Sequence, residues 1–152
     1  MAQTKAPSGV VPKRPGSVLF VCGMNAIRSP MAESLVKAIY GRAIYAQSAG
    51  VESGSPDPFM AATMAEIGIT MDRHKPTMLE DLADSFFDLI VTLAPEAHHR
   101  AMELTRTHAV DVEYWPTMDP STVAGNREQV MAAYRQVREA LERKIRSRFG
   151  EP

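Results

Sequence analysis

The chain has 152 residues, of which 45 % are apolar and 23 % charged, values typical of one ordinary globular domain. Its net charge of −1 gives no general attraction to nucleic acid or an anionic membrane, and no apolar run approaches the roughly 18 residues of a membrane-spanning helix. The single cysteine excludes an internal disulfide and a cysteine-based zinc cluster. We therefore expect a cytoplasmic protein that binds neither nucleic acid nor membrane.

Residues 1–16 are rich in proline, glycine and small polar residues, and their three charged side chains are all basic. No apolar core follows these charges, so the segment is not a secretory signal, and no amphipathic pattern supports a transit peptide. We expect a disordered tail over residues 1–16 and a single folded domain over residues 17–150.

The first half of this domain alternates between strand and helix patterns. Residues 17–21 form an apolar, β-branched run that predicts a buried strand. Apolar residues then recur at steps of four over residues 30–40, which predicts a helix with Ser29 as its N-cap. A second strand is predicted over residues 43–47, closed by three small residues, and a second helix over residues 58–67, stopped by a glycine.

The second half repeats this alternation. Residues 87–93 predict a third strand, residues 95–104 a helix opened by proline, and residues 110–115 a fourth strand. Residues 127–149 predict a long amphipathic helix whose basic last turns suit the negative end of the helix dipole. Alternating strands and helices predict an α/β fold with a parallel sheet and helices on both faces. Ligands of such sheets bind at the carboxyl ends of the strands, near a switch in strand order.

Cys22 directly follows the first predicted strand and therefore belongs at that edge. A lone cysteine is more often a small buried apolar residue, but this one begins a short loop that enters a helix N-terminus. Such a place favours the thiolate, and the backbone N–H groups of the loop can converge on an anion. The planar guanidinium of Arg28 can hold two phosphate oxygens, and Ser29 can donate a hydrogen bond to the sulfur.

One loop can thus supply a nucleophile, an oxyanion cradle and a counter-charge, which together favour catalysis without a metal or a cofactor. No Gly-Lys-Ser/Thr follows, so the loop is not a nucleotide-binding P-loop. The residues expected to bind phosphate are Gly23, Met24, Asn25, Ala26, Ile27, Arg28 and Ser29.

The run VLFVCGMNAIRSPMAES resembles the low-molecular-weight protein tyrosine phosphatase family, whose loop has Cys, five residues, Arg and Ser. The likeness continues to residue 149 and includes FDLIVTLA and an Asp-Pro pair. It implies a three-layer, four-stranded sheet and a cysteinyl-phosphate intermediate that water hydrolyses. It also implies a hydrogen-bond network that supports the loop, formed by Asn25, Ser29, Ser48 and His74.

Two Asp-Pro pairs are candidates for the general acid. Asp57 stands just before a predicted helix, where an aspartate is more often an N-cap. Asp119 follows the fourth predicted strand at the edge where Cys22 lies, and the family likeness selects the same residue. The adjacent His98 and His99 are predicted to be surface residues, and no acid or cysteine pattern makes them metal ligands.

The chain departs from the phosphatase pattern at several points. Ile27 replaces the second cysteine of the loop, and residues 51–56 and 121–122 lack the aromatics that wall a phosphotyrosine pocket, unless Trp115 or a distant tyrosine reaches in. The segments HKPTMLEDL, FDLIVTLAPEA and YWPTMDP resemble the thioredoxin-coupled arsenate reductases, which share this fold and loop. Those enzymes carry a second cysteine just after the third strand, where this chain has Ala94.

The sequence is compatible with three functions. The first is a phosphomonoesterase acting on a phosphorylated protein or a small phosphate ester. The alternative is an arsenate reductase that uses an external small thiol. The third is a module that binds phosphate without turnover, and the joint presence of Cys22, Arg28 and Asp119 argues against it.

Overall fold

The computed structural model describes residues 14–82, 86–107 and 110–152. Their strands form one parallel sheet in the order β2-β1-β3-β4. The strands are β1 (Ser17–Cys22), β2 (Tyr45–Gly50), β3 (Leu89–Thr92) and β4 (Asp111–Tyr114). The α-helices are α1 (Arg28–Tyr40), α2 (Pro58–Ala65), α3 (Pro95–Leu104) and α4 (Arg127–Phe149).

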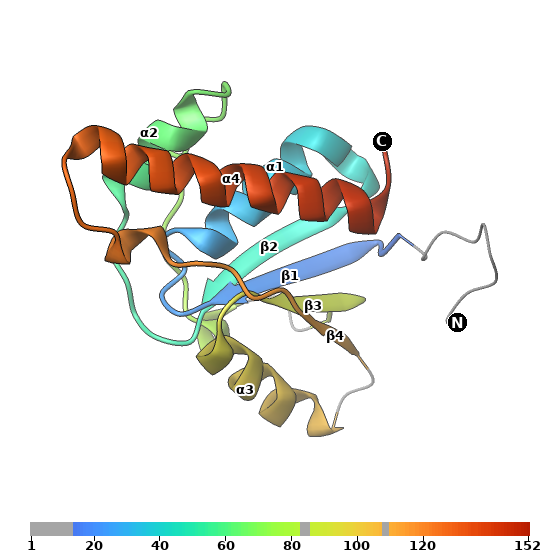
Figure 1. Ribbon diagram of the computed structural model, residues 1–152. Coiled ribbons are helices and arrows are strands. Elements are labelled where there is room, and N and C mark those ends of the chain that lie inside the picture. The colour runs from blue at the N-terminus through green and yellow to red at the C-terminus, as the bar shows by residue number, and fades with distance from the viewer. Residues whose placement is uncertain (1–13, 83–85, 108–109) are drawn as a thin grey trace.

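The sheet lies between two helical layers, as the sequence predicts. Figure 1 shows α1, α2 and α4 on one face of the sheet and α3 on the other. Val18 and Phe20 of β1 belong to the larger core beneath α1 and α4, whereas Leu19 and Val21 belong to a smaller cluster beneath α3. Both sides of β1 are therefore buried, which explains why its sequence is continuously apolar instead of alternating.

Several predicted boundaries differ by one to three residues, and two of these differences have identifiable reasons. The helix α1 begins at Arg28, so Ser29 lies inside it and is not its N-cap; the cap position is Ile27, with no capping side chain. The strand β2 runs to Gly50, because it pairs with β1 along its whole length, up to Cys22 opposite Gly50. The small residues that were expected to close this strand therefore belong to it.

The predicted tail lies mostly outside the described residues. Its last residues contact the domain: Arg14 donates from Nε to the carbonyl oxygen of Phe149 at 2.9 Å and lies over the Tyr40 ring. The amide of Gly16 donates to the carboxylate of Asp88 at 2.9 Å. Residues 14–16 are thus attached to the start of the sheet.

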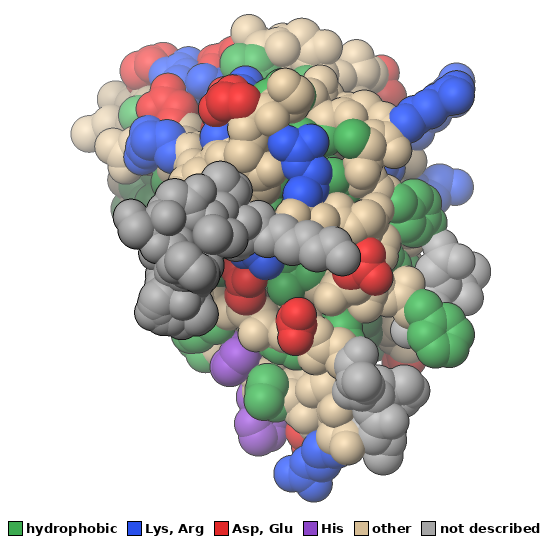
Figure 2. Space-filling view, turned by 90° about the vertical axis from the view of Figure 1, so that its right-hand side faces the viewer, with side chains coloured by type: hydrophobic (Ala, Val, Ile, Leu, Met, Phe, Trp, Pro, Cys, Tyr) green, Lys and Arg blue, Asp and Glu red, His purple; other side chains and the backbone are tan. Residues whose placement is uncertain are grey.

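Figure 2 shows the side of the molecule on the right of Figure 1, where acidic and basic side chains are interspersed instead of gathered by sign. No helix within the described ranges is both long and apolar enough to cross a membrane.

Candidate active site

The strand order places Cys22 at the centre of one sheet edge. The chain leaves β1 toward β2 on one side, while β3 pairs with β1 on the other, so the sheet order reverses at β1. Cys22 is the last residue of β1 and is 3 % exposed. Residues 23–27 then lead directly into α1. This is the position at which open parallel sheets bind ligands.

The loop after Cys22 is bent at Asn25, which has a positive φ of 55°. The carbonyl oxygen of Asn25 accepts a hydrogen bond from Nε2 of His74 at 2.8 Å, so this ring nitrogen carries the proton. Because a trans peptide is planar, the following N–H of Ala26 points away from His74. Gly50 lies against the same bend, since a Cβ there would come within 2.7 Å of the Asn25 nitrogen.

The backbone donors of this loop are unused. Among the described residues, the N–H groups of Met24, Asn25, Ala26 and Ile27 donate to no other protein group. Three of these residues are at most 8 % exposed: Asn25, Ala26 and Ile27. Buried N–H groups in folded proteins are nearly always paired. A loop with several such donors is therefore shaped to receive an acceptor from outside, and a tetrahedral oxyanion offers several acceptor oxygens.

The side chain of Asn25 sets the direction of a buried hydrogen-bond network. Its Oδ1 accepts from the Thr77 amide at 2.9 Å, which fixes the orientation of the side-chain amide. Its Nδ2 therefore donates to Oγ of Ser29 and Oγ of Ser48, each at 2.9 Å. Ser48 in turn donates to the carboxylate of Glu33 in α1.

This direction determines what Ser29 can do. Its Oγ accepts from Asn25, so its own proton is free for another acceptor. The nearest is the sulfur of Cys22 at 2.8 Å, whereas the carbonyl oxygen of Ala49 lies 3.4 Å away. The Ser29 hydroxyl can therefore donate a hydrogen bond to the sulfur of Cys22.

Arg28 links the loop of residues 23–27 to the loop that follows β4. Its Nη1 donates to the carbonyl oxygen of Thr117 at 2.9 Å. Asp119 stands two residues further on and caps the short 3₁₀ helix η4 (Pro120–Thr122). Its Oδ1 accepts from the amide and the hydroxyl of Ser121, at 2.9 and 2.7 Å. Asp119 and Cys22 thus belong to segments that one arginine connects.

Asp57 has a different surrounding. Its Oδ1 accepts from the amide of Met60, which confirms the expectation that it caps α2. Its Oδ2 accepts from the hydroxyl of Tyr134 at 2.9 Å. Burial, followed by this hydrogen bond to a carboxylate, raises the pKa of Tyr134 well above its ordinary value. Both oxygens of Asp57 are therefore engaged in structural hydrogen bonds, one that caps α2 and one that joins it to α4.

The aromatic and histidine expectations have mixed outcomes. Trp115 is buried in the larger core, where its ring contacts Phe20 in an edge-on arrangement. His98 is only half-exposed, because its Nδ1 bonds Oγ1 of Thr92 at 2.9 Å and its ring stacks on Tyr114. The prediction of a surface residue is confirmed for His99, which is exposed, and only in part for His98.

Two charged residues near the loop were not predicted from sequence. Glu33 joins the network through Ser48 and stands four positions after Ser29 on the same helix. Glu96 of α3 reaches the loop from the other face, since a Cβ at Gly23 would lie 3.0 Å from its Oε1. A helical spacing of four could have revealed Glu33, but no local pattern marks Glu96. No cluster of three or more potential metal ligands occurs in the part of the chain that the structure describes.

Known proteins resemble this chain in sequence and in fold. Residues 17–150 match the family model described as low molecular weight phosphotyrosine protein phosphatase. An arsenate reductase of Bacillus licheniformis is 30 % identical over 135 residues, which are 89 % of this chain and 95 % of that protein.

Two solved structures illustrate the range of activities among its neighbours. An arsenate reductase in the phosphate binding state is 26 % identical, with a TM-score of 0.66 over 85 % of this chain and 92 % of that one. A low molecular weight protein tyrosine phosphatase from T. tengcongensis is 26 % identical, with a TM-score of 0.69 over 86 % and 95 %. Since the family model covers the described domain from β1 to the end of α4, this chain belongs to the low molecular weight phosphotyrosine protein phosphatase family, whose relatives here include arsenate reductases.

Proposed function

We propose that this protein is a phosphomonoesterase that works through a cysteinyl-phosphate intermediate, without metal or cofactor. The observation that supports this most directly is the joint placement of three groups: the Cys22 sulfur with its Ser29 donor, the unused loop amides, and Arg28 bonded to the loop of Asp119. A phosphorylated protein or a small phosphate ester is the expected substrate.

In the first step, the thiolate of Cys22 attacks phosphorus while the loop amides and Arg28 hold the non-bridging oxygens. The carboxylic acid of Asp119 protonates the leaving oxygen as the P–O bond breaks. In the second step, the Asp119 carboxylate takes a proton from water, whose oxygen attacks phosphorus. The P–S bond breaks, phosphate leaves, and Ser29 donates to the departing sulfur.

Arg28 can serve the oxyanion and the acid loop at the same time. A guanidinium has five N–H donors, and a bidentate grip on phosphate uses two of them. The bond from Nη1 to Thr117 can therefore persist when the anion is bound. This would keep Asp119 at a constant position relative to the phosphoryl group.

Arsenate reduction with an external thiol is the second candidate, and the 30 % identity to an arsenate reductase over 89 % of the chain favours it. Arsenate resembles phosphate in size and charge, so the loop should bind it and Cys22 can form an arseno-thiol adduct. A second thiolate must then attack the Cys22 sulfur, which releases arsenite and leaves a disulfide. The chain has one cysteine, so that thiol would have to come from another molecule.

Parallel assays separate the two candidates. We expect aryl phosphate turnover that survives chelators and disappears in Cys22→Ser, together with negligible arsenate reduction when thioredoxin is the only reductant. Mass spectrometry after treatment with arsenate and glutathione would detect a mixed disulfide on Cys22. Fast arsenate turnover with that adduct, and no hydrolysis of any phosphate ester, would establish the reductase in place of the phosphatase.

A further inference from the structure

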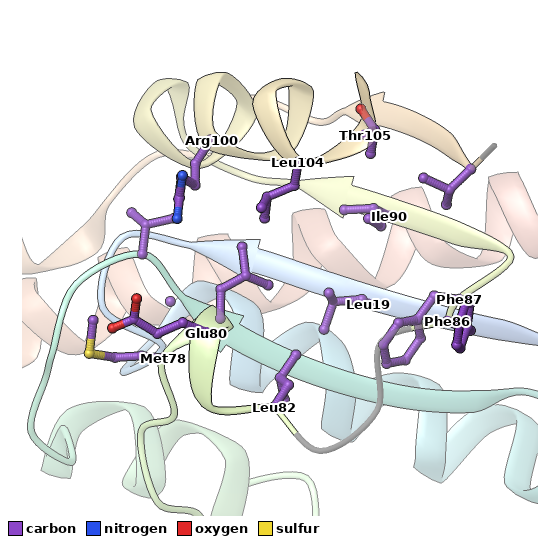
Figure 3. Close-up of a pocket in the computed structure, with 14 residues that line it drawn as sticks. Leu19, Met78, Glu80, Leu82, Phe86, Phe87, Ile90, Arg100, Leu104 and Thr105 are labelled. Atoms are coloured by element: carbon purple, nitrogen blue, oxygen red, sulfur yellow. The ribbon is translucent and has the colours of Figure 1, made fainter. Parts of the chain in front are cut away.

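A cavity lies beneath α3, on the sheet face opposite α1 and α4. Its volume is about 470 Å³, within the range of roughly 300–1,000 Å³ found for small-molecule sites. Figure 3 shows it between α3 and the segment around residues 78–82, over β1 and β3. Cys22, Arg28 and Asp119 do not line it, so it is distinct from the proposed active site.

The body of this cavity is apolar. It is lined by Leu19 of β1, Ile90 of β3, Leu104 of α3, and Leu82 and Phe87 of the opposite wall. Leu104 remains 39 % exposed, although it is a large apolar side chain. An alkyl or aryl group placed here would be removed from water on several sides, which favours binding.

One end of the cavity carries two opposite charges. Figure 3 shows Arg100 reaching in from α3, with Glu80 and Met78 on the other wall at the same end. Arg100 pairs with Glu103 only at 3.7 Å, and both side chains are 46 % exposed, so this pair contributes little. Within the described ranges, the side chain of Glu80 forms no hydrogen bond or ion pair. A ligand that complements this end of the cavity therefore carries, in its head group, an anion for Arg100 and a cation for Glu80.

The floor at this charged end is hydrogen-bonded to the catalytic loop. Gly50 and Val51 line the cavity, and the amide of Val51 donates to the carbonyl oxygen of Gly23 at 2.8 Å. The amide of Gly50 donates to the carbonyl oxygen of Thr77, whose own amide holds Asn25. An occupant in contact with Val51 is thus one hydrogen bond away from the residue that follows Cys22.

We infer that this cavity binds a small amphiphile with a zwitterionic head, of the class of apolar α-amino acids, and that its occupancy alters the reactivity of Cys22. The carboxylate pairs with Arg100, the ammonium group pairs with Glu80, and the apolar body lies between Leu19 and Leu104. This site does not depend on which reaction Cys22 performs.

Three matched probes test the head group: 3-(2-naphthyl)-L-alanine, 3-(2-naphthyl)propanoate and 2-(2-naphthyl)ethylamine. They share one apolar body, and the last two each lack one charge of the first. Because a hydrogen bond to a charged partner is lost, each should bind about tenfold more weakly than the amino acid in NMR titrations. Arg100→Gln should remove the preference over the amine, and Glu80→Gln the preference over the propanoate. Arg106→Gln, a charge loss outside the cavity lining, should change neither.

The coupling is tested by the rate at which iodoacetamide alkylates Cys22, with and without saturating naphthylalanine. We expect naphthylalanine to change the alkylation rate constant of the wild type. In Arg100→Gln, the same change should require higher naphthylalanine concentrations. Equal affinity for all three probes, or affinities insensitive to both glutamine variants, would overturn the proposed site. Binding that leaves the alkylation rate unchanged would overturn the coupling. Neither readout requires phosphatase activity, so a failure of the proposed function would be seen separately.

Discussion

The shape of the loop that follows Cys22 can be tested most directly at Asn25. This residue is fully buried, has a φ of 55°, and its side chain makes hydrogen bonds to the Thr77 amide, Ser29 and Ser48. Asn25→Ala and Asn25→Gly both remove these three bonds. At about 1 kcal/mol for each buried hydrogen bond, the free energy of unfolding should fall by about 3 kcal/mol.

The two variants should differ from each other in an unusual direction. Alanine in the left-handed region is strained by about 1–2 kcal/mol, whereas glycine adopts it freely. The glycine variant should therefore be the more stable, although glycine normally costs about 0.5–1 kcal/mol relative to alanine within regular elements. Urea denaturation measures both values, and Asn126→Ala, which removes a helix cap at the surface, provides a control of about 1 kcal/mol. An alanine variant as stable as the glycine variant would refute the account of this bend.

Three further predictions concern the chemistry and the acid stability. Ser29→Ala removes the donor to the departing sulfur, so hydrolysis of the cysteinyl-phosphate should slow by about 10–100-fold. The assay should then show a larger initial burst of released alcohol, followed by slow turnover. Unchanged burst kinetics would contradict this role. Asp119→Asn should slow the release of alkyl alcohols by up to about 10²–10⁴-fold, and the release of nitrophenol far less. Asp57→Asn should lower the stability more than the rate. The assignment of Asp119 as the general acid fails if the two variants exchange these behaviours. Hydrogen bonds from Arg135 and then Arg138 lower the pKa of Glu66 from 4.5 to about 2, so its stabilising effect is present above pH 4.5 and is lost as the pH falls toward 2. Urea unfolding of Glu66→Gln should therefore show a weaker pH dependence across that interval, and an unaltered pH profile would count against the network.

The layers of the fold could be predicted because they depend on local patterns. Apolar segments bounded by turn residues predicted all four strands, and the charged outer face of residues 127–149 predicted α4 with its observed limits. The end of β2 could not be predicted, since small residues alone are typical of a turn. It extends to Gly50 because Cys22 pairs opposite and the loop packs where a side chain would clash.

The same distinction applies to the site. Cys22, Arg28 and Ser29 lie within one short motif, so their proximity followed from the sequence. The support from Thr77 and Thr117 could not be predicted, because it comes from a backbone amide and a backbone carbonyl, which every residue possesses. The direction of the Ser29 hydrogen bond likewise depends on the orientation of Asn25, which the Thr77 amide fixes.

The sheet register also predicts whether one added cysteine would supply, within this chain, the second thiol that arsenate reduction requires. Val21 pairs opposite Thr92, and the amide of Leu93 donates to the carbonyl oxygen of Val21, so Leu93 is level with Cys22 and position 94 lies one residue further along the same edge. Neighbouring strands are ~4.8 Å apart, and the Cα atoms of a disulfide are usually about 4.4–6.8 Å apart. Ala94→Cys should therefore allow one turnover of arsenate without added thiol, since two thiols supply the two electrons that convert arsenate to arsenite, with release of water. We expect about one arsenite per chain and a loss of two hydrogens in the protein mass, neither of which the wild type should show. A variant that binds arsenate yet forms no disulfide would show that the two side chains do not approach each other, and that a thiol at position 94 is insufficient for reduction in this fold.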